Sequence, residues 1–161
     1  MKILLVGKTG QLGLSLIKTL PKYIAGKVVD FYMISREELD LSIPNKCEEL
    51  VMKYKPDYLI NAAAYTAVDL AESQKKLTYQ INSEAPTIFA KTLKKIGGKL
   101  IHFSTDYVFD GNKSLPYNTT DTVNPLNTYG LSKFVGEQNI LDVMASTQQA
   151  KIIRTSWLYD S

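Results

Sequence analysis

The chain has 161 residues, of which 45% are hydrophobic and 22% are charged, and its formal net charge is +3 at pH 7. This length and composition are typical of one globular domain with a buried core. The charge is small and dispersed, with Lys91, Lys94 and Lys95 on a predicted helix surface, so the composition does not favour a nucleic-acid-binding protein. Nowhere do about 18 apolar residues run together, so no membrane-spanning helix is expected. The single cysteine, Cys47, excludes an internal disulfide, and with no targeting segment at the N-terminus we expect a cytoplasmic protein.

The apolar residues predict alternating strands and helices. Residues 3–6 form a continuous apolar run, which is typical of a strand buried on both faces of a parallel sheet. Further strands are expected at residues 28–34, 58–60, 99–103 and 151–154. Helices are expected from the first glycine-rich segment to Pro21, from Pro44 to Tyr54, over 68–96 with an interruption near Ser73 or at 82–86, and over 129–144. Residues 108–128 are rich in Asn, Pro, Thr and Gly and predict a long loop with a functional role.

This alternation predicts right-handed crossovers and a doubly wound parallel sheet of the Rossmann-like α/β class. With the strands numbered along the chain, the expected order is 3-2-1-4-5, with ligands above the carboxyl ends of strands 1 and 4. Residues 1–161 are therefore expected to form one nucleotide-binding domain, and the chain stops soon after its fifth strand, before any C-terminal substrate-binding domain.

A glycine-rich segment directly follows the first strand and opens a helix, which is the setting that a dinucleotide-binding loop requires. Gly7 would allow the tight turn, Gly10 the approach of a pyrophosphate, and Gly13 close packing of the helix. The spacing G-x-x-G-x-x-G is that of short-chain dehydrogenases, although a plain turn is an alternative. A P-loop is excluded, since that motif needs a glycine where Lys2 stands.

The residues after the second strand predict which dinucleotide is bound. Ser35 and Arg36 stand where NAD-binding proteins usually place an acidic residue, and a basic residue suits a ribose 2′-phosphate. Asp30 lies too early in the strand to reach the ribose. We therefore favour NADP(H), with NAD(H) still open because Arg36 has a plain solvated alternative.

Tyr129 and Lys133 stand four residues apart on a predicted helix, and Thr105 ends the neighbouring strand. Together they suit carbonyl reduction, in which Thr105 donates a hydrogen bond to the oxygen and Tyr129 supplies a proton. A free tyrosine titrates near pH 10, and Lys133 with an oxidised nicotinamide is expected to lower that pKa. Without the glycine-rich segment, the four-residue spacing of Tyr129 and Lys133 would say little about function.

Other polar residues have simpler interpretations. His102 alternates with apolar neighbours in a strand and is interpreted as a packed or bridging histidine rather than a catalyst. Asp69 and Glu72 would suit a carboxylate pair or a metal site, but at the start of a helix they more simply complement its dipole.

Five segments carry a more specific pattern: residues 7–13 (GKTGQLG), 61–69 (NAAAYTAVD), 104–111 (STDYVFDG), 125–130 (PLNTYG) and 154–157 (RTSW). In this order they resemble the dTDP-4-dehydrorhamnose reductases, an extended short-chain dehydrogenase/reductase family. The resemblance implies reduction of the C4 ketone of dTDP-4-dehydro-L-rhamnose by NAD(P)H, the last step to dTDP-L-rhamnose for cell-surface polysaccharide. It also implies a nucleotide-sugar partner and allows a homodimer.

Site residues follow from the resemblance position by position. The implied catalytic residues are Thr105, Tyr129 and Lys133. The implied cofactor-binding residues are Gly7, Gly10, Gln11, Leu12, Gly13, Ser35, Arg36, Asp40, Leu41, Ala62, Ala63, Ala64, Tyr129 and Lys133. The implied substrate-binding residues are Thr66, Val68, Tyr107 and Trp157. Some family members hold magnesium through a glutamate where Ser15 stands here, so no metal is predicted.

Alternatives to an active reductase stay open at this stage. Family members are considerably longer, and the further part supplies most of the nucleotide-sugar pocket. The chain could therefore be an inactive cofactor-binding fragment. It could also be a regulatory protein similar to the regulatory subunit of methionine adenosyltransferase, although the Thr–Tyr–Lys set favours an enzyme. The nucleotide, dTDP or UDP, is not determined.

Overall fold

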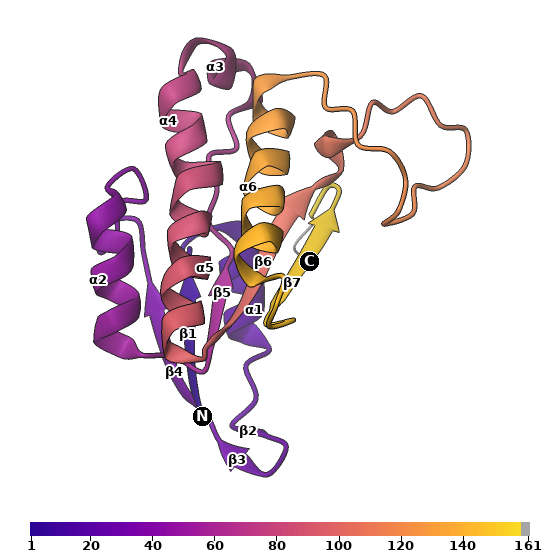
Figure 1. Cartoon of the computed structure of the whole chain (residues 1–161). Helices are drawn as coiled ribbons and strands as arrows, with labels where there is room; N and C mark the ends of the chain where they lie inside the picture. Colours follow the sequence, from indigo (N-terminus) through magenta and orange to yellow (C-terminus); the bar gives the residue numbers. More distant parts are fainter. Residues whose placement is uncertain (159–161) are drawn as a thin grey trace.

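Figure 1 shows the computed structural model of the chain, in which residues 1–158 are described. Its centre is a five-stranded parallel sheet with the order β4-β1-β5-β6-β7. The strands are β1 (Lys2–Val6), β4 (Asp30–Ile34), β5 (Tyr58–Asn61), β6 (Lys99–Thr105) and β7 (Ala150–Thr155). A separate antiparallel hairpin pairs β2 (Tyr23–Ile24) with β3 (Lys27–Val28), so the strand expected at 28–34 is divided at Val29.

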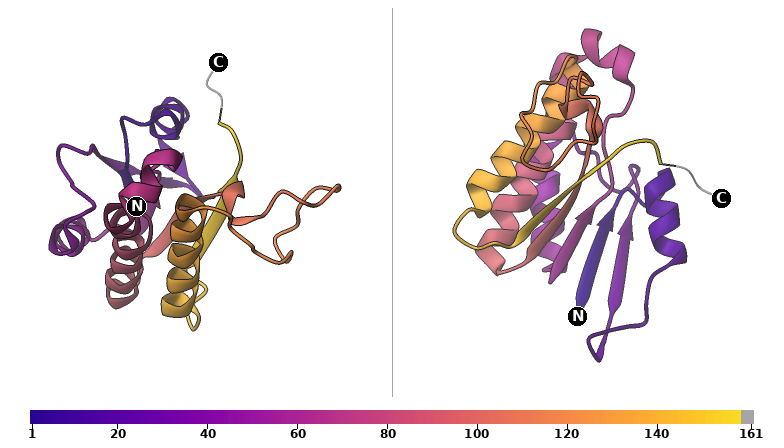
Figure 2. Two further views of the ribbon diagram at one scale, coloured as in Figure 1. Left: turned by 90° about the horizontal axis from the view of Figure 1, so that it is seen from above. Right: turned by 90° about the vertical axis from the view of Figure 1, so that its right-hand side faces the viewer.

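Helices cover both faces of the sheet (Figure 2). They are α1 (Gln11–Lys18), α2 (Pro44–Tyr54), α3 (Val68–Ser73), α4 (Lys75–Tyr79), α5 (Ala85–Ile96) and α6 (Thr128–Met144), with a π-helical turn η1 (Gln80–Glu84) and a 3-10 turn η2 (Asp106–Val108). In the described part of the chain α1 lies on one face, and α2, α5 and α6 lie on the other. Right-handed crossovers explain this division, because only the step from β1 to β4 runs toward that edge of the sheet.

The predicted Rossmann-like class is confirmed, but the predicted strand order is wrong. In the numbering used for the prediction the observed order is 2-1-3-4-5, because β5 lies between β1 and β6. Residues 35–57 hold a single helix, α2, which packs against α5 and returns the chain across β1. No strand is therefore added outside β4. The winding reverses between β1 and β5, and the ligand position predicted for a doubly wound sheet moves to that point.

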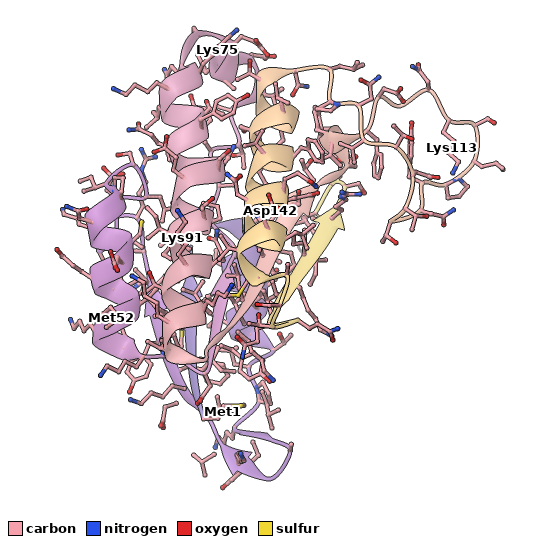
Figure 3. The ribbon with its side chains drawn as sticks, viewed as in Figure 1. Met1, Met52, Lys75, Lys91, Lys113 and Asp142 are labelled. Atoms are coloured by element: carbon pink, nitrogen blue, oxygen red, sulfur yellow. The ribbon has the colours of Figure 1, made fainter. Side chains whose placement is uncertain are left out.

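The main core lies between the sheet and the α2–α5–α6 layer. Leu4, Leu59 and Leu100 on three adjacent strands are at most 1% exposed and belong to one cluster with Phe89 and Ile140. Lys91 on α5 and Asp142 on α6 point outward from this layer (Figure 3). The predicted lysines Lys91, Lys94 and Lys95 are exposed, as expected for a solvated helix face.

The long helical region breaks near Ser73, the first of the two positions that the sequence left open, whereas at the second it continues as a π-helical turn. Gln74 separates α3 from α4, and the π-helical turn occupies residues 80–84 before α5 begins. Gly97 ends α5 in the left-handed conformation, with φ of 75°. In the described residues no helix has the length and apolar character needed to cross a membrane.

Candidate functional site

A cavity of about 630 Å³ lies at the carboxyl ends of the parallel strands. The segments that end or follow β1, β4, β5, β6 and β7 all border it. The predicted residues that line it are Gly7, Gly10, Gln11, Leu12, Ser35, Arg36, Asp40, Leu41, Ala62, Ala63, Ala64, Thr66, Thr105, Tyr129 and Lys133. The fold therefore gathers residues that lie more than a hundred positions apart in the chain at the place where doubly wound sheets bind ligands.

The glycine-rich segment is held tightly between β1 and α1. Gly7 has φ of 96°, and a β-carbon there would lie 2.8 Å from the backbone nitrogen of Ala63. A β-carbon on Gly13 would overlap the carbonyl oxygen of Gly7, so Gly13 contributes to the site by packing although it does not line the cavity. Gly10 differs, because the nearest atom to its β-carbon would be the Gly7 oxygen at 3.6 Å. The three glycines thus have separate physical roles.

Two features of the cavity wall fit a polar, anionic ligand. The first turn of α1 has no side-chain cap and no acidic residue, and its residues Gln11 and Leu12 line the cavity together with Gly10. The hydroxyl oxygen of Ser104 is buried and, within residues 1–158, has no hydrogen-bond partner. An unpartnered buried hydroxyl in the wall fits a cavity that binds a polar ligand. These features fit a dinucleotide.

After β4, the carboxylate of Glu38 is hydrogen-bonded within the segment that contains Ser35 and Arg36. Glu38 Oε2 accepts a hydrogen bond from Lys8 Nζ at 2.7 Å and from the Ser35 backbone nitrogen at 2.9 Å. These bonds, the one from Lys8 first, lower the pKa of Glu38 to about 2. Arg36 is exposed and lines the cavity. Sequence reasoning missed Glu38, and its position three residues after Ser35 was the available signal.

Asp40 and Leu41 follow the same segment toward α2. The Asp40 carboxylate accepts hydrogen bonds from the Ser42 hydroxyl at 2.7 Å and the Ser42 backbone nitrogen at 2.9 Å, and these bonds lower its pKa. Leu41 is buried and belongs to the main core. Asp30, which the sequence excluded as a ribose ligand, is the register partner of Lys2 in the sheet. Both residues lie at the start of their strands, away from the cavity. The place of Asp30 at the start of β4 agrees with the reason given for the exclusion, which stays a prediction.

Thr105 ends β6, and Tyr129 lies in the first turn of α6, so both line the same cavity wall. Burial raises the pKa of the Tyr129 phenol, while a hydrogen bond with Thr105 lowers it. The Thr105 hydroxyl also donates to Asp106 Oδ1 at 3.1 Å. Because a hydroxyl has one proton, Thr105 can donate to only one of these partners at a time.

Lys133 is 2% exposed, and its side-chain nitrogen is held by Phe103 and His102. Lys133 Nζ lies 2.7 Å from the Phe103 carbonyl oxygen and 3.3 Å from His102 Nε2. Burial lowers the pKa of Lys133 to about 8, against an opposing effect of Glu137. The predicted lowering of the Tyr129 pKa, by Lys133 together with an oxidised nicotinamide, stays a prediction; in the protein alone burial raises that pKa, and the other groups that act on it are Thr105, Asp106 and Tyr107.

His102 is a bridging histidine, as predicted. It is fully buried, with Nδ1 3.1 Å from Asn61 Nδ2 on β5 and Nε2 facing Lys133 on α6. Burial and the neighbouring Lys133 hold the pKa of His102 well below its usual value, so the imidazole is neutral.

Glu72 differs from its predicted role. Its two carboxylate oxygens accept hydrogen bonds from the backbone nitrogen and the hydroxyl of Thr128, both at 2.7 Å. Thr128 begins α6, so Glu72 complements the start of that helix rather than its own. Asp69 does lie in the first turn of α3. The correction could not be made from sequence, because Glu72 and Thr128 are distant in the chain.

Of the four residues expected to line a sugar, one lies in the cavity wall and three lie outside it. Thr66 lines the cavity, whereas Val68 begins α3 outside it. Tyr107 is 37% exposed and lies edge-on to Tyr129, with ring centroids 5.6 Å apart. Trp157 is 74% exposed and does not line the cavity. The loop that joins β6 to α6 projects outward, with Lys113 near its tip, and none of residues 109–127 lines the cavity (Figure 3).

Sequence reasoning also missed several residues of the cavity wall. These are Val6, Thr9, Leu39, Tyr65, Ala67, Ile81, Phe103, Ser104, Thr155, Ser156 and Leu158. Leu158 is joined to the glycine-rich segment by a 2.8 Å hydrogen bond from Gln11 Nε2 to its carbonyl oxygen. A contact of this kind has no local signal in the sequence, because it joins the two ends of the chain.

Comparison with known proteins gives a consistent result. A family model described as RmlD substrate binding domain matches residues 1–161. The dTDP-4-dehydrorhamnose reductases of Burkholderia thailandensis and Salmonella typhimurium are 43% and 41% identical over 159 and 160 residues. Each alignment covers 99% of this chain and 51% or 52% of the relative, so the chain spans about half the length of these proteins.

Solved structures agree with the sequence comparison. A dTDP-4-dehydrorhamnose reductase from Clostridium acetobutylicum has a TM-score of 0.89 and 38% identity, covering 100% of this chain and 55% of that one. The enzyme of Bacillus anthracis in complex with NADP has a TM-score of 0.88 and 34% identity, covering 98% of this chain and 54% of that one.

Proposed function

Because the chain belongs to the RmlD substrate-binding-domain family, we propose that it is the cofactor-binding part of an NADP(H)-dependent dTDP-4-dehydrorhamnose reductase. The activity would be reduction of the C4 ketone of dTDP-4-dehydro-L-rhamnose. One observation carries the proposal: a single cavity is lined by the glycine-rich segment and by Thr105, Tyr129 and Lys133. The relatives named as this reductase agree with it.

The cofactor would lie along the carboxyl ends of the strands. Gly7, Gly10, Gln11, Leu12 and Gly13 would hold its pyrophosphate, Ser35 and Arg36 its adenosine ribose, Asp40 and Leu41 its adenine, and Ala62, Ala63, Ala64, Tyr129 and Lys133 its nicotinamide half. The uncapped start of α1 and the unpartnered Ser104 hydroxyl support this placement. NADP(H) is preferred because Arg36 lines the cavity and no acidic side chain replaces it at that position. The related enzyme of Bacillus anthracis was solved with NADP.

The chemistry assigns roles to Thr105 and Tyr129. The reduced cofactor supplies the hydride. As the ketone oxygen gains negative charge, Thr105 would donate a hydrogen bond to it, turning its hydroxyl away from Asp106. Tyr129 would give the proton, and the raised pKa of its phenol keeps that proton in place until it is needed.

The sugar would be recognised only in part by this chain. Thr66, Val68, Tyr107 and Trp157 are proposed to line it, and a C-terminal substrate-binding domain outside residues 1–161 would supply the rest. Tyr107 is supported by its contact with Tyr129. The resemblance also allows a homodimer, which sedimentation of the purified chain would test. We propose that the reductase acts in the cytoplasm, as expected from the sequence.

Cofactor binding is the direct test. The purified chain is titrated with NADPH and NADH while cofactor fluorescence is followed. We expect NADPH to bind more tightly, and Arg36→Ala to remove most of the difference because it removes the cation that faces the 2′-phosphate. Lys91→Ala, on the outward face of α5, is the control. Failure to bind either dinucleotide would overturn the proposal, and equal affinities would overturn the choice of NADP(H).

The acid role of Tyr129 is tested by Tyr129→Phe. In a longer protein that joins residues 1–161 to a substrate-binding domain, oxidation of NADPH by dTDP-4-dehydro-L-rhamnose should slow by about 10²- to 10⁴-fold, the usual contribution of a positioned general acid. NADPH affinity should change little, because only the hydroxyl is lost. Turnover close to that of the unsubstituted protein would show that another group donates the proton.

A further inference from the structure

Asn61, His102 and Lys133 form a connected row of buried polar side chains behind the cavity wall. Asn61 and His102 are register partners on β5 and β6, and both are fully buried. Each imidazole nitrogen of His102 donates or accepts according to the tautomer, whereas the Asn61 amide nitrogen can only donate and its oxygen can only accept. The direction of each bond can therefore be followed from one end of the row to the other.

The row begins at the backbone of the cavity wall. Asn61 Oδ1 accepts a hydrogen bond from the Ala63 backbone nitrogen at 3.2 Å, which leaves Asn61 Nδ2 facing His102 Nδ1 at 3.1 Å. An amide nitrogen only donates, so His102 Nδ1 must accept. The proton of a neutral imidazole then lies on Nε2, which faces Lys133 Nζ at 3.3 Å.

This direction of bonding has a consequence for Lys133. A protonated ammonium has no lone pair, so it cannot accept from an Nε2–H group. The row as the structure has it is therefore satisfied when Lys133 is an uncharged amine. A charged Lys133 would need an imidazole with its proton on Nδ1, and Asn61 would then have to turn its amide and give up the bond to Ala63.

We propose that His102 is a positioning residue for Lys133, and that loss of a proton from Lys133 is coupled to transfer of the imidazole proton from Nδ1 to Nε2. The proton count balances. Lys133 Nζ changes from three N–H bonds to two, the imidazole keeps one proton on a different nitrogen, and one proton leaves toward the cavity. Because Ala63 also lines the cavity, the protonation of Lys133 is linked to the backbone of the cofactor-binding wall.

The charged surroundings of Lys133 are compatible with this exchange. On its own helix Glu137 favours the charged form, but Glu137 is also bonded to Arg154 of β7. Tyr129 lines the cavity beside Lys133, and Asp106 in η2 acts on Tyr129. On β6 the facing group is His102. Burial outweighs Glu137 and brings the pKa of Lys133 to about 8, so the exchange falls in an accessible range of pH.

The test uses a property of the sequence: His102 is the single histidine of the chain. Its ring nitrogens are therefore observed without ambiguity by long-range ¹H–¹⁵N NMR of the labelled chain. From about pH 6 to about pH 10, we expect a neutral imidazole whose protonated nitrogen changes from Nδ1 to Nε2 near the pH at which Lys133 titrates. A proton fixed on one nitrogen throughout, or formation of imidazolium, would overturn the proposal.

Two variants give independent outcomes. Asn61→Asp is nearly isosteric but presents only acceptors, so it should keep the proton on Nδ1 and move the titration of Lys133 upward by at least about one pH unit. Lys133→Met should keep the proton on Nε2 at every pH. Persistence of the unsubstituted exchange in either variant would contradict the coupling. A role in proton delivery to Tyr129 would rest on the proposed function, but these spectra report on the row whether or not the chain is part of a reductase.

Discussion

Lys133 illustrates how a single buried residue can cost stability at a site. Its side chain is 2% exposed, and its hydrogen-bond partners in the described residues are a carbonyl oxygen and an imidazole rather than a carboxylate. The pKa is about 8 in the folded chain against an ordinary value of 10.5. The folded state therefore holds the Lys133 proton less tightly than the unfolded state does.

This difference predicts a pH-dependent stability. Between about pH 8 and about pH 10.5 the unfolded chain binds more protons, so the free energy of unfolding gains from Lys133 as pH rises. Below that range the full penalty, about 3 kcal/mol from the two pKa values, is present. Lys133→Met removes this contribution. Urea unfolding of both proteins across the range should show their difference changing by up to about 3 kcal/mol in favour of the unsubstituted chain, and a constant difference would contradict the buried titration.

Gly10 and Gly13 provide a second comparison at the residue scale. Gly10 has φ of −75°, and its β-carbon would be no closer than 3.6 Å to another atom, so Gly10→Ala should change the free energy of unfolding by less than about 1 kcal/mol. Its methyl group would meet the proposed pyrophosphate, so NADPH affinity should fall by about tenfold or more. Gly13→Ala overlaps the Gly7 carbonyl and should destabilise the fold itself by more than about 2 kcal/mol. Calorimetry and cofactor titration separate the two effects, and equal losses of stability would contradict this distinction.

At the scale of elements, α6 is fixed at its start and along its buried face. Asn127 accepts from the Gly130 nitrogen at 2.7 Å, and Glu72 binds Thr128. Ser83 in the π-helical turn donates to the Ser132 carbonyl oxygen at 2.6 Å. These bonds fix the helix that carries Tyr129 and Lys133, and those from Glu72 and Ser83 come from parts of the chain far from it.

The pair between Glu137 and Arg154 joins α6 to β7, with Arg154 Nη2 2.6 Å from Glu137 Oε2. The Glu137 side chain is 1% exposed, so Arg154→Ala would leave a buried, unpaired carboxylate and should cost about 3–5 kcal/mol. Adding Glu137→Gln to that variant should recover part of the loss, which a double-mutant cycle in urea would measure. The exposed pair between Lys95 and Glu48 is the control, and Lys95→Ala should cost less than about 1 kcal/mol. Strictly additive effects at the buried pair would count against its role.

At the scale of the whole molecule, the cavity joins segments from both ends of the chain. Gln11 near the N-terminus is hydrogen-bonded to Leu158, and β7 forms one edge of the sheet. A ligand in this cavity would contact the segments after every strand of the parallel sheet. Cofactor binding should therefore stabilise the fold as a unit rather than one element.

NADPH is accordingly expected to raise the melting temperature of the chain. At about one hundred times its dissociation constant it should add about 2.7 kcal/mol, which corresponds to about 5–10 °C for a domain of this size. NADH at the same concentration should raise it less, and Arg36→Ala should reduce the difference. Scanning calorimetry gives the measurement. A melting temperature that does not respond to NADPH would contradict binding within the cavity.

Local sequence signals were sufficient for most elements and for much of the candidate site. The apolar run at residues 3–6, Pro44 and the glycine pair at 97–98 each mark a boundary that the structure confirms, because buried strands, first helical turns and left-handed helix ends depend on neighbouring residues. The glycine-rich segment and the end of β6 were placed for the same reason. The predicted strand order was wrong because it depends on where α2 packs. The sequence of residues 35–57 does not determine that position.

The sequence by itself determined that this is a Rossmann-like domain and which segments meet at its ligand-binding edge, since parallel crossovers bring all strand carboxyl ends to one side. Only the tertiary structure decided how the polar groups behind that edge are paired. Glu72 binds the start of α6, Lys133 is bonded to His102 rather than to Tyr129, and burial raises the Tyr129 pKa. Hydrogen-bond direction and desolvation depend on distances of a few tenths of an ångström between distant segments, and spacing along the chain does not specify them.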